Sequence, residues 1–369
     1  MDNKRLTYAE IDLAAIKHNI NIVKKHTTAQ IMAVVKADAY GHGVDRVSQV
    51  CLDAGVNYLG VATIEEAMHL RDIGISLPIL IFGHLADEYV NLAIEHNISI
   101  TVYDYRFAKV ISQKAFSLGK KALIHIKVDT GMGRLGFYPA KAALKEIINI
   151  AQLDCLDLEG IYTHLAQADT LDTTFSIQQI EEFVRITNEL GKNGLHFRLK
   201  HTANSAATLN LPTTHFDMVR PGIILYGLRP SDEVYDKDLQ PALKLKSQVT
   251  QIKNVLAGAT IGYGRTYSCN RPTKIATIPV GYADGYSRIL SNQAWGIIKG
   301  QKVPLVGNVC MDQCMFDVTD IKEVREGEEI LLIGSKADGI TADDLANIMG
   351  TINYEVVCAI SARIPRIYI

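Results

Sequence analysis

The sequence has 369 residues and no long uncharged apolar run, which excludes a transmembrane helix of about 20 residues and an obvious signal peptide. Cysteine is scarce and nowhere forms a Cys-x-x-Cys pair, so a disulfide scaffold is excluded and we expect reduced thiols. An excess of one charge is also missing, because 38 Lys and Arg balance 40 Asp and Glu. The net charge of −2 argues against nucleic acid as the main partner. We expect a cytoplasmic protein.

Hydrophobic residues make up 48% of the chain, enough for a large core, and they are arranged in a regular order. Helix-like stretches separate eight short β-rich runs: IMAVVKA at 31, NYLGVAT at 57, PILIFG at 78, ISITVYD at 98, ALIHIKVDT at 122, LDLEGIYTHLA at 156, HFRLKHT at 196 and FDMVRPG at 216. Strands that alternate with helices pair in parallel, and eight such units predict a (β/α)₈ TIM barrel. An open doubly wound sheet is the alternative.

After about residue 240 the pattern changes to short alternating runs broken by Gly, Pro and Asn turns. One clear helix, TADDLANIMG, interrupts them. We therefore predict two domains of an α/β protein: a barrel over residues 1–240 and a mostly antiparallel β domain over 241–369. About the first 10 residues are candidates for pairing with the β domain.

Polar residues follow several of the predicted barrel strands, where the loops of such a barrel converge on one mouth. They are Lys36, Asp129 with Arg134, His164, Asn204 with Ser205, and Arg220 with Gly222. Lys36 follows the apolar run IMAVV, so we expect partial desolvation that favours the neutral amine needed for Schiff-base chemistry. A lysine that only reaches out to solvent is the alternative. The Tyr and Gly-His-Gly after Lys36, and the other polar strand ends, favour a cavity.

The segment GMGRLG fits the dinucleotide-binding pattern G-x-G-x-x-G through Gly131, Gly133 and Gly136. Pro139 follows this motif, and Pro favours the first turn of a helix, so we predict that the helix begins after the motif rather than within it. The glycines then serve to bend a loop and to orient Arg134. A nicotinamide oxidoreductase is the corresponding alternative function.

Tyrosines of the β domain lie beside glycines, in IGYGRTYS and PVGYADGYSR. Glycine on both sides of Tyr263 predicts a side chain on an exposed loop rather than one packed in a strand. For any single tyrosine, an ordinary interface residue is the alternative. Cys310 has no neighbouring His that would support a nucleophilic role.

Taken together, the motifs resemble the alanine racemase family of pyridoxal-phosphate enzymes from Tyr8 to Arg366. The segments that carry the resemblance are AVVKADAYGHG, KVDTGMGRLGF, YTHLAQAD, HTANSAA, VRPGIILYG, IGYGRTY, PVGYADGY, GNVCMDQ and INYEVVCAISARIPR. The resemblance implies racemisation of L- and D-alanine for peptidoglycan and cell wall synthesis. It also implies the cofactor pyridoxal 5′-phosphate, no metal, and a head-to-tail homodimer with shared active sites.

The resemblance assigns the two catalytic roles to Lys36 and Tyr263. Lys36 would form the internal aldimine and act as base on the D side, and Tyr263 of the partner subunit would act on the L side. Arg134 and the Met311 amide would hold the substrate carboxylate. Arg134 would also contact the cofactor, and Lys127 would be a candidate for carbamylation.

The same resemblance assigns a cofactor-binding set and an entrance. The cofactor would contact Lys36, Tyr40, Arg134, His164, Asn204, Ser205, Arg220, Gly222, Ile223 and Tyr354. The entrance would be lined by Asp169, Tyr282, Arg288 and Ile352. A broader racemase that accepts serine, a fold-related pyridoxal-phosphate decarboxylase and a non-catalytic carrier of the cofactor remain as alternatives.

Overall fold

Two units make up the protein in its computed structural model, which describes residues 5–369. The barrel unit contains Ile16–Ala39 and Val44–Leu239. The β unit contains residues 5–15, Tyr40–Gly43 and Gln240–Ile369.

Eight parallel strands form the centre of the barrel unit in the order β8-β7-β6-β5-β4-β3-β2-β9. They are β2 (Gln30–Val34), β3 (Tyr58–Val61), β4 (Ile79–Ile81), β5 (Ile98–Val102), β6 (Ala122–Lys127), β7 (Leu156–Tyr162), β8 (Leu199–His201) and β9 (Met218–Val219). Beside the two outer strands, the Asp217 N–H donates to the Lys200 carbonyl at 3.0 Å, and the Arg220 N–H donates to the Ala203 carbonyl at 2.9 Å. These bonds close the sheet, so the predicted TIM barrel is confirmed and the open doubly wound sheet is wrong.

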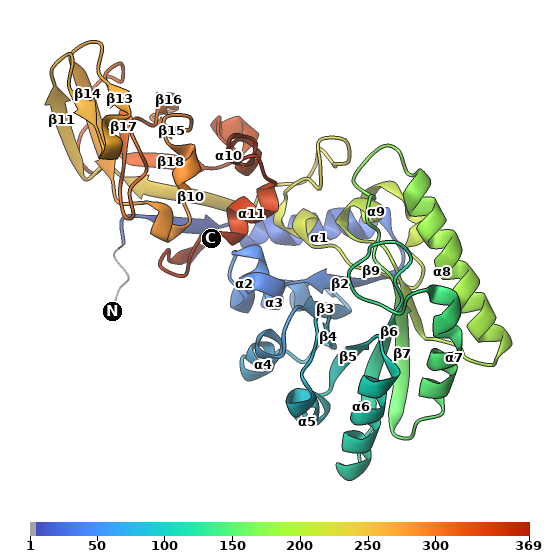
Figure 1. Ribbon diagram of the computed structural model, residues 1–369. Coiled ribbons are helices and arrows are strands. Elements are labelled where there is room, and N and C mark those ends of the chain that lie inside the picture. The colour runs from blue at the N-terminus through green and yellow to red at the C-terminus, as the bar shows by residue number, and fades with distance from the viewer. Residues whose placement is uncertain (1–4) are drawn as a thin grey trace. The chain divides into compact units, whose positions relative to one another are not determined.

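Helices cover the outside of the barrel, as Figure 1 shows for α4 to α8. They are α3 (Val44–Asp53), α4 (Ile64–Asp72), α5 (Val90–Glu95), α6 (Tyr105–Ser117), α7 (Ala140–Ala151), α8 (Thr174–Lys192) and α9 (Ser205–Asn210), while α1 (Leu13–His26) crosses from one unit to the other. Side-chain caps define several starts, since Asp104 accepts from the Phe107 N–H at 2.7 Å. Helix α7 begins at Ala140, after the glycine motif, as predicted.

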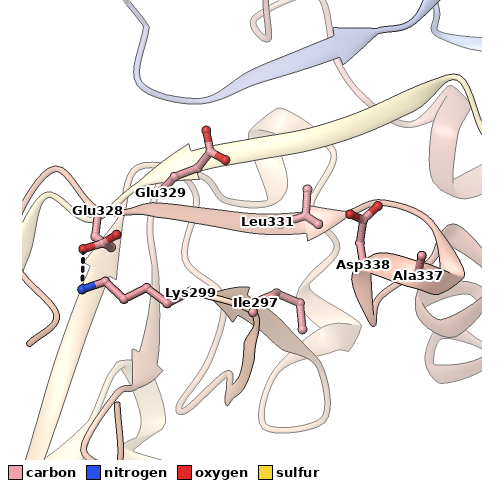
Figure 2. A pocket seen from close by; sticks show the side chains of 8 residues that line it. Ile297, Lys299, Glu328, Glu329, Leu331, Ala337 and Asp338 are labelled. Carbon is pink, nitrogen blue, oxygen red and sulfur yellow. Dashed lines mark ion pairs between the residues drawn. The ribbon is translucent and has the colours of Figure 1, made fainter. Parts of the chain in front are cut away.

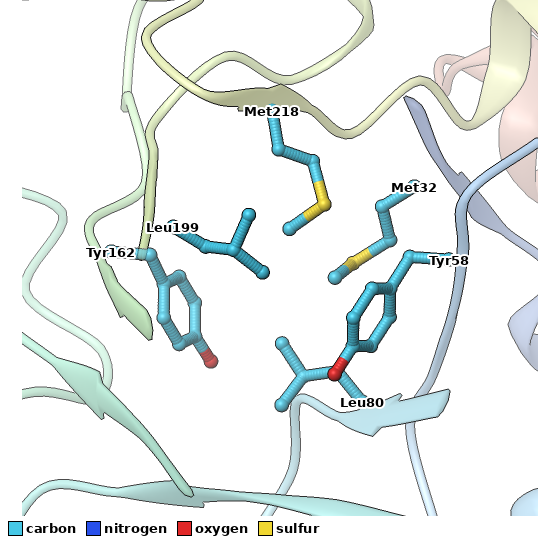
Figure 3. Packing of buried hydrophobic residues seen from close by; sticks show 6 residues of the cluster. All are labelled: Met32, Tyr58, Leu80, Tyr162, Leu199 and Met218. Carbon is cyan, nitrogen blue, oxygen red and sulfur yellow. The ribbon is translucent and has the colours of Figure 1, made fainter. Parts of the chain in front are cut away.

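The interior of the barrel is packed rather than open. One buried cluster joins Met32, Tyr58, Leu80, Tyr162, Leu199 and Met218, and Figure 3 shows these side chains converging from different strands. Strands that are covered by helices outside and by this cluster inside are apolar on both faces, as parallel strands usually are. The packed interior leaves the ends of the strands as the place for polar chemistry.

The β unit is mostly antiparallel. Its largest sheet has six strands: β16 (Gln301–Pro304), β15 (Trp295–Ile298), β18 (Glu329–Ile333), β10 (Leu243–Gln248), β1 (Tyr8–Ile11) and β19 (Arg366–Tyr368). A second sheet contains β11 (Gln251–Val255), β14 (Thr273–Ile278) and β17 (Cys314–Asp317), and β12 (Thr260–Ile261) pairs with β13 (Tyr267–Ser268). Only the β1–β19 pair of the six-stranded sheet is parallel.

The sequence predicted one helix after residue 240, and residues 241–369 of the structure contain two α-helices. Besides α10 (Ala342–Met349), a shorter helix α11 runs over Asn353–Cys358. Its six residues are too few to show a helical repeat of apolar positions, which is why the pattern missed it.

Candidate functional site

Lys36 lies at the C-terminal end of β2 and is half-buried. Directly after it, four residues that are not glycine, Ala37 to Tyr40, have φ of 53° or 54°, which makes a left-handed turn. This conformation costs roughly 1–2 kcal/mol per residue, so it persists only where surrounding contacts hold it. The Glu66 carboxylate accepts from the Ala37 N–H at 2.7 Å, and Asp38 accepts from the Val44 N–H at 2.8 Å. Lys36 is therefore followed directly by a strained turn that contacts from Glu66 and Val44 hold in place.

Arg220 is 4% exposed and follows β9. Its guanidinium donates to the carbonyls of Thr163 at 2.8 Å and Thr202 at 3.0 Å, and to the ring nitrogens of His201 at 2.9 Å and His164 at 3.3 Å. Burial lowers the Arg220 pKa to about 10, which still leaves the group charged at neutral pH. Within the described part of the chain, its Nε–H has no acceptor. Arg220 therefore offers a fixed positive charge and a spare donor at Nε.

Several basic side chains lie near His164. Burial lowers its pKa well below the ordinary value, and Arg220, Lys127, Arg134 and Lys36 lower it further. His164 is therefore neutral at pH 7. Basic side chains that follow β2, β6 and β9 thus act on one place in the barrel unit.

Lys127 is buried at the end of β6, with its ammonium 4.5 Å from the centre of the Tyr162 ring. Burial lowers its pKa well below the ordinary value, and Arg220 and Arg134 add to that effect while Asp129 opposes it. A neutral amine is the form of lysine that can react with an electrophile.

Asp129 organises the loop that carries Arg134. Its carboxylate accepts from the backbone N–H groups of Gly131 at 2.9 Å, Met132 at 2.8 Å, Gly133 at 3.1 Å and Arg134 at 3.1 Å. Burial by itself would raise the Asp129 pKa, but these bonds outweigh it and lower the pKa. The glycine motif thus forms a loop whose N–H groups surround the Asp129 carboxylate. The Arg134 side chain on this loop is exposed.

Asp129→Asn is expected to lower the free energy of unfolding by about 1–2 kcal/mol at pH 7, since an amide NH₂ replaces one accepting oxygen. Because the folded pKa lies below the unfolded value of about 3.9, the carboxylate stabilises the fold above that value. This stabilisation is lost as the pH falls through the folded pKa. Urea unfolding at neutral and acidic pH measures the difference, with the exposed Asp154→Asn as control. An equal loss at every pH would contradict this assignment.

The predicted phosphate-binding residues of the barrel unit lie together. The Gly222 N–H donates to the Ser205 hydroxyl at 2.8 Å. Asn204 caps α9 by accepting from the Ala207 N–H at 3.0 Å, and Ile223 begins the 3₁₀ turn Ile223–Tyr226. Residues after β8 and β9 therefore converge, which is where TIM barrels often bind phosphate.

In the β unit, three of the motifs meet. Tyr263 is 73% exposed in a turn between Gly262 and Gly264, as its sequence predicted, and the Asn308 amide donates to its carbonyl at 2.7 Å. The Tyr282 N–H donates to the Cys310 carbonyl at 3.0 Å. The structure therefore brings the turns of IGYGRTY and PVGYADGY against GNVCMDQ.

Position 281, where these turns contact each other, has room only for glycine. A Cβ atom on Gly281 would lie 2.4 Å from the Met311 carbonyl oxygen and 2.3 Å from that of Cys310, which no side chain tolerates. Met311 has an exposed side chain, and its backbone N–H has no acceptor among residues 5–369. The Met311 N–H, which we predicted to bind the substrate carboxylate, can therefore donate a hydrogen bond.

The remaining predicted residues fall into two groups. In the β unit, the rings of Tyr40 and Tyr354 lie 6.1 Å apart, and burial raises the Tyr40 pKa. The predicted entrance residues are all exposed: Asp169 in the barrel unit, and Tyr282, Arg288 and Ile352 in the β unit.

The residues of the barrel unit fit pyridoxal phosphate. Its phosphate is an anion, which suits the charged Arg220 near His164 and the converging turns after β8 and β9. Its ring nitrogen is an acceptor when unprotonated, which suits the spare Nε–H of Arg220. Lys36 supplies an amine at the same end of the barrel.

The sequence patterns did not single out the residues that hold Arg220 in place. His201 accepts from Arg220, and the Tyr162 ring stacks on His201 with 4.7 Å between the ring centres. His201 is the first residue of the motif HTANSAA, and Tyr162 is the first residue of YTHLAQAD. Their place in these motifs was the only feature of the sequence that pointed to them.

A separate pocket of about 480 Å³ lies in the β unit, and Figure 2 shows its charged rim, where Lys299 pairs with Glu328 at 3.2 Å. Strand residues Ile297 and Leu331 line its floor. None of the predicted site residues lines this pocket. Among residues 5–369 no His, Cys, Asp and Glu side chains cluster as metal ligands would, and the same range holds no helix long and apolar enough to cross a membrane.

Comparison with known proteins covers nearly the whole chain. Residues 11–230 match the family model of the alanine racemase N-terminal domain, and residues 242–368 match that of the C-terminal domain. Alanine racemases of Methanococcus maripaludis and Desulforamulus reducens are 47% and 46% identical, over 98% and 99% of this chain and 98% and 100% of theirs.

Solved structures agree. Alanine racemase of Clostridium difficile has a TM-score of 0.96 at 40% identity, covering 100% of this chain and 97% of that one. Alanine racemase of Bacillus anthracis has a TM-score of 0.94 at 38% identity, covering 100% and 96%. The chain therefore belongs to the alanine racemase family, whose members are isomerases that act on amino acids.

Proposed function

We propose that this protein interconverts L-alanine and D-alanine with pyridoxal 5′-phosphate, and that Lys36 and Tyr263 are its two proton-carrying bases. The observation that carries the proposal is the buried, charged Arg220 beside the neutral His164, at the end of the barrel where Lys36 lies. Bound pyridoxal phosphate would withdraw electrons from the substrate and make its α-proton acidic.

The cofactor would be held by both its phosphate and its ring. Ser205, Gly222 and Ile223 would bind the phosphate together with Tyr40 and Tyr354, and Asn204 would keep the α9 turn in shape. Arg220 would donate to the ring nitrogen. A guanidinium can donate hydrogen bonds but cannot accept them, so Arg220 would keep that nitrogen unprotonated.

The substrate carboxylate would be bound by Arg134 and by the backbone N–H of Met311. The Asp129-centred loop supports this role, because it fixes the backbone from Gly131 to Arg134. Lys127 would carry a carbamate whose negative charge orients Arg134, and its lowered pKa provides the neutral amine for that modification.

Racemisation needs a proton removed from one face of the α-carbon and returned on the other. Lys36 would exchange the proton on the D side and Tyr263 the proton on the L side. The 73% exposure of Tyr263 supports its action on substrate held by a second copy of the chain. We therefore propose a head-to-tail homodimer with shared sites.

Four exposed residues would form the entrance to this site: Asp169, Tyr282, Arg288 and Ile352. Their bulk would favour small amino acids. By the precedent of the family, the reaction would take place in the cytoplasm and supply D-alanine for peptidoglycan.

The direct test is a racemisation assay of the purified protein with added pyridoxal phosphate. We expect conversion of L-alanine to D-alanine and the reverse, little conversion of lysine, and a rate with serine that defines the breadth of the pocket. Release of CO₂ from lysine without racemisation of alanine would instead support a decarboxylase. A protein that shows no visible absorption band after addition of pyridoxal phosphate would refute the proposal.

A further inference from the structure

We propose that Glu159, in β7 of the barrel, is a positioning residue for Arg220 and acts through a buried chain of two histidines. Arg220 contacts the His201 Nδ1 at 2.9 Å, the His201 Nε2 contacts the His125 Nδ1 at 2.9 Å, and the His125 Nε2 contacts a Glu159 carboxylate oxygen at 3.2 Å. Both imidazoles are fully buried.

The two ends of this chain determine its direction. Arg220 has only donors, so the His201 Nδ1 must accept, and the His201 Nε2–H must then donate to the His125 Nδ1. His125 in turn donates through Nε2–H, which requires an acceptor beyond it. An ionised carboxylate has only acceptors, so Glu159 completes the sequence with both histidines neutral and in the Nε2–H tautomer.

The backbone accommodates the contact between His125 and Glu159 in two ways. The β6–β7 register pairs Ile124 with Leu158 and His125 with Gly160, so Glu159 is an extra residue in a β-bulge. At Gly160, a Cβ atom would lie 2.3 Å from the His125 ring nitrogen. The bulge and the missing side chain together make room for the histidine beside the carboxylate.

The surroundings keep Glu159 ionised and the histidines neutral. Burial would raise the Glu159 pKa, but hydrogen bonds from His125, Tyr58 and Ser99 lower it to about 2. Burial lowers the pKa of both His125 and His201, and the nearby Arg220 charge lowers them further. The side chain of Arg198, 61% exposed, contacts the other Glu159 oxygen at 3.3 Å.

The consequence for the reaction rests on the proposed function. If Arg220 donates to the cofactor ring, its orientation depends on His201, and the orientation of His201 depends on His125 and Glu159. Removing the last acceptor would leave the buried His125 Nε2–H unsatisfied and allow the chain to rearrange. The proposed carboxylate donors, Arg134 and the Met311 N–H, are not part of this chain, so the effect should fall on kcat.

The first test does not depend on activity. Nitrogen-15 NMR of histidine side chains, assigned with single His125→Gln and His201→Gln variants, should show both rings as the neutral Nε2–H tautomer at neutral pH. In Glu159→Leu at least one ring should change tautomer, whereas Glu159→Gln should retain the pattern because its amide oxygen still accepts. An Nδ1–H tautomer or a charged ring in the unmodified protein would overturn the proposal whether or not the protein is a racemase.

The second test uses the holoenzyme. We expect Glu159→Leu to lower kcat by about tenfold with KM changed less than about twofold, and Glu159→Gln to restore most of kcat. The matched control is Asp157→Asn. Asp157 lies on the same strand as Glu159 and contacts the same Arg198 at 3.2 Å, but it contacts no histidine among residues 5–369. Its kcat should not change. Equal losses in Asp157→Asn and Glu159→Leu, or unchanged kcat in Glu159→Leu, would overturn the proposal.

Discussion

Lys36→Ala is expected to abolish racemisation, with a loss of at least about 10⁴-fold, and to remove the covalent attachment of pyridoxal phosphate. The proposed site contains one lysine at the end of β2, and it would serve both as the anchor of the cofactor and as the base on one face. Borohydride reduction followed by mass spectrometry should locate the cofactor on Lys36 in the unmodified protein and nowhere in the variant.

The control for this variant is Lys200→Ala. Lys200 is also a barrel-strand lysine, but it lies between the core residue Leu199 and the buried His201, and successive strand residues face opposite sides. Its side chain therefore points away from the interior, and the activity and attached cofactor should be retained. Attachment to another lysine in the unmodified protein would show that Lys36 is not the anchor.

Tyr263→Phe is expected to lower racemisation by roughly 10³–10⁴-fold while the cofactor stays bound, because only the hydroxyl of one base is removed. Exchange of the α-proton in deuterated water should reveal the asymmetry. L-alanine should lose its exchange first, since Lys36 remains to serve the D side.

Tyr267→Phe provides the matched control in the same segment. Tyr267 packs against the buried cluster of Ile261, Cys269, Ile275 and Val306 and is not part of the exposed turn, so its hydroxyl should not matter for exchange. Equal loss of exchange from both enantiomers in Tyr263→Phe would contradict the assignment of one base to each face.

Local order in the chain was enough to predict the barrel. The eight apolar runs correspond to the eight barrel strands β2 to β9, because alternation of strands and helices is a property of short segments. The start of α7 after the glycine motif was also predictable, since Pro139 restricts the backbone locally. Helix α11 was missed because six residues carry no repeat.

The sequence predicted only part of the candidate site. Lys36, Arg134, His164 and Arg220 could be named because they end predicted strands, and the ends of barrel strands meet at one mouth. The left-handed turn after Lys36 could not be predicted, since Ala37, Asp38 and Ala39 have no local preference for it. Contacts with Glu66 and Val44 hold that conformation, and these residues are distant or unremarkable in the sequence.

By itself the sequence determined the order of strands and helices, the family, and the residue types available at each strand end. Only the tertiary structure decided that β8 lies beside β9, that Arg220 contacts His164, and that Arg220 is linked to Glu159 through His201 and His125. The physical reason is the separation along the sequence over which each effect acts. Backbone preference and hydrophobic periodicity act over a few residues, whereas hydrogen bonds inside the barrel join residues far apart in the sequence, such as Arg220 and Thr163, which are 57 positions apart.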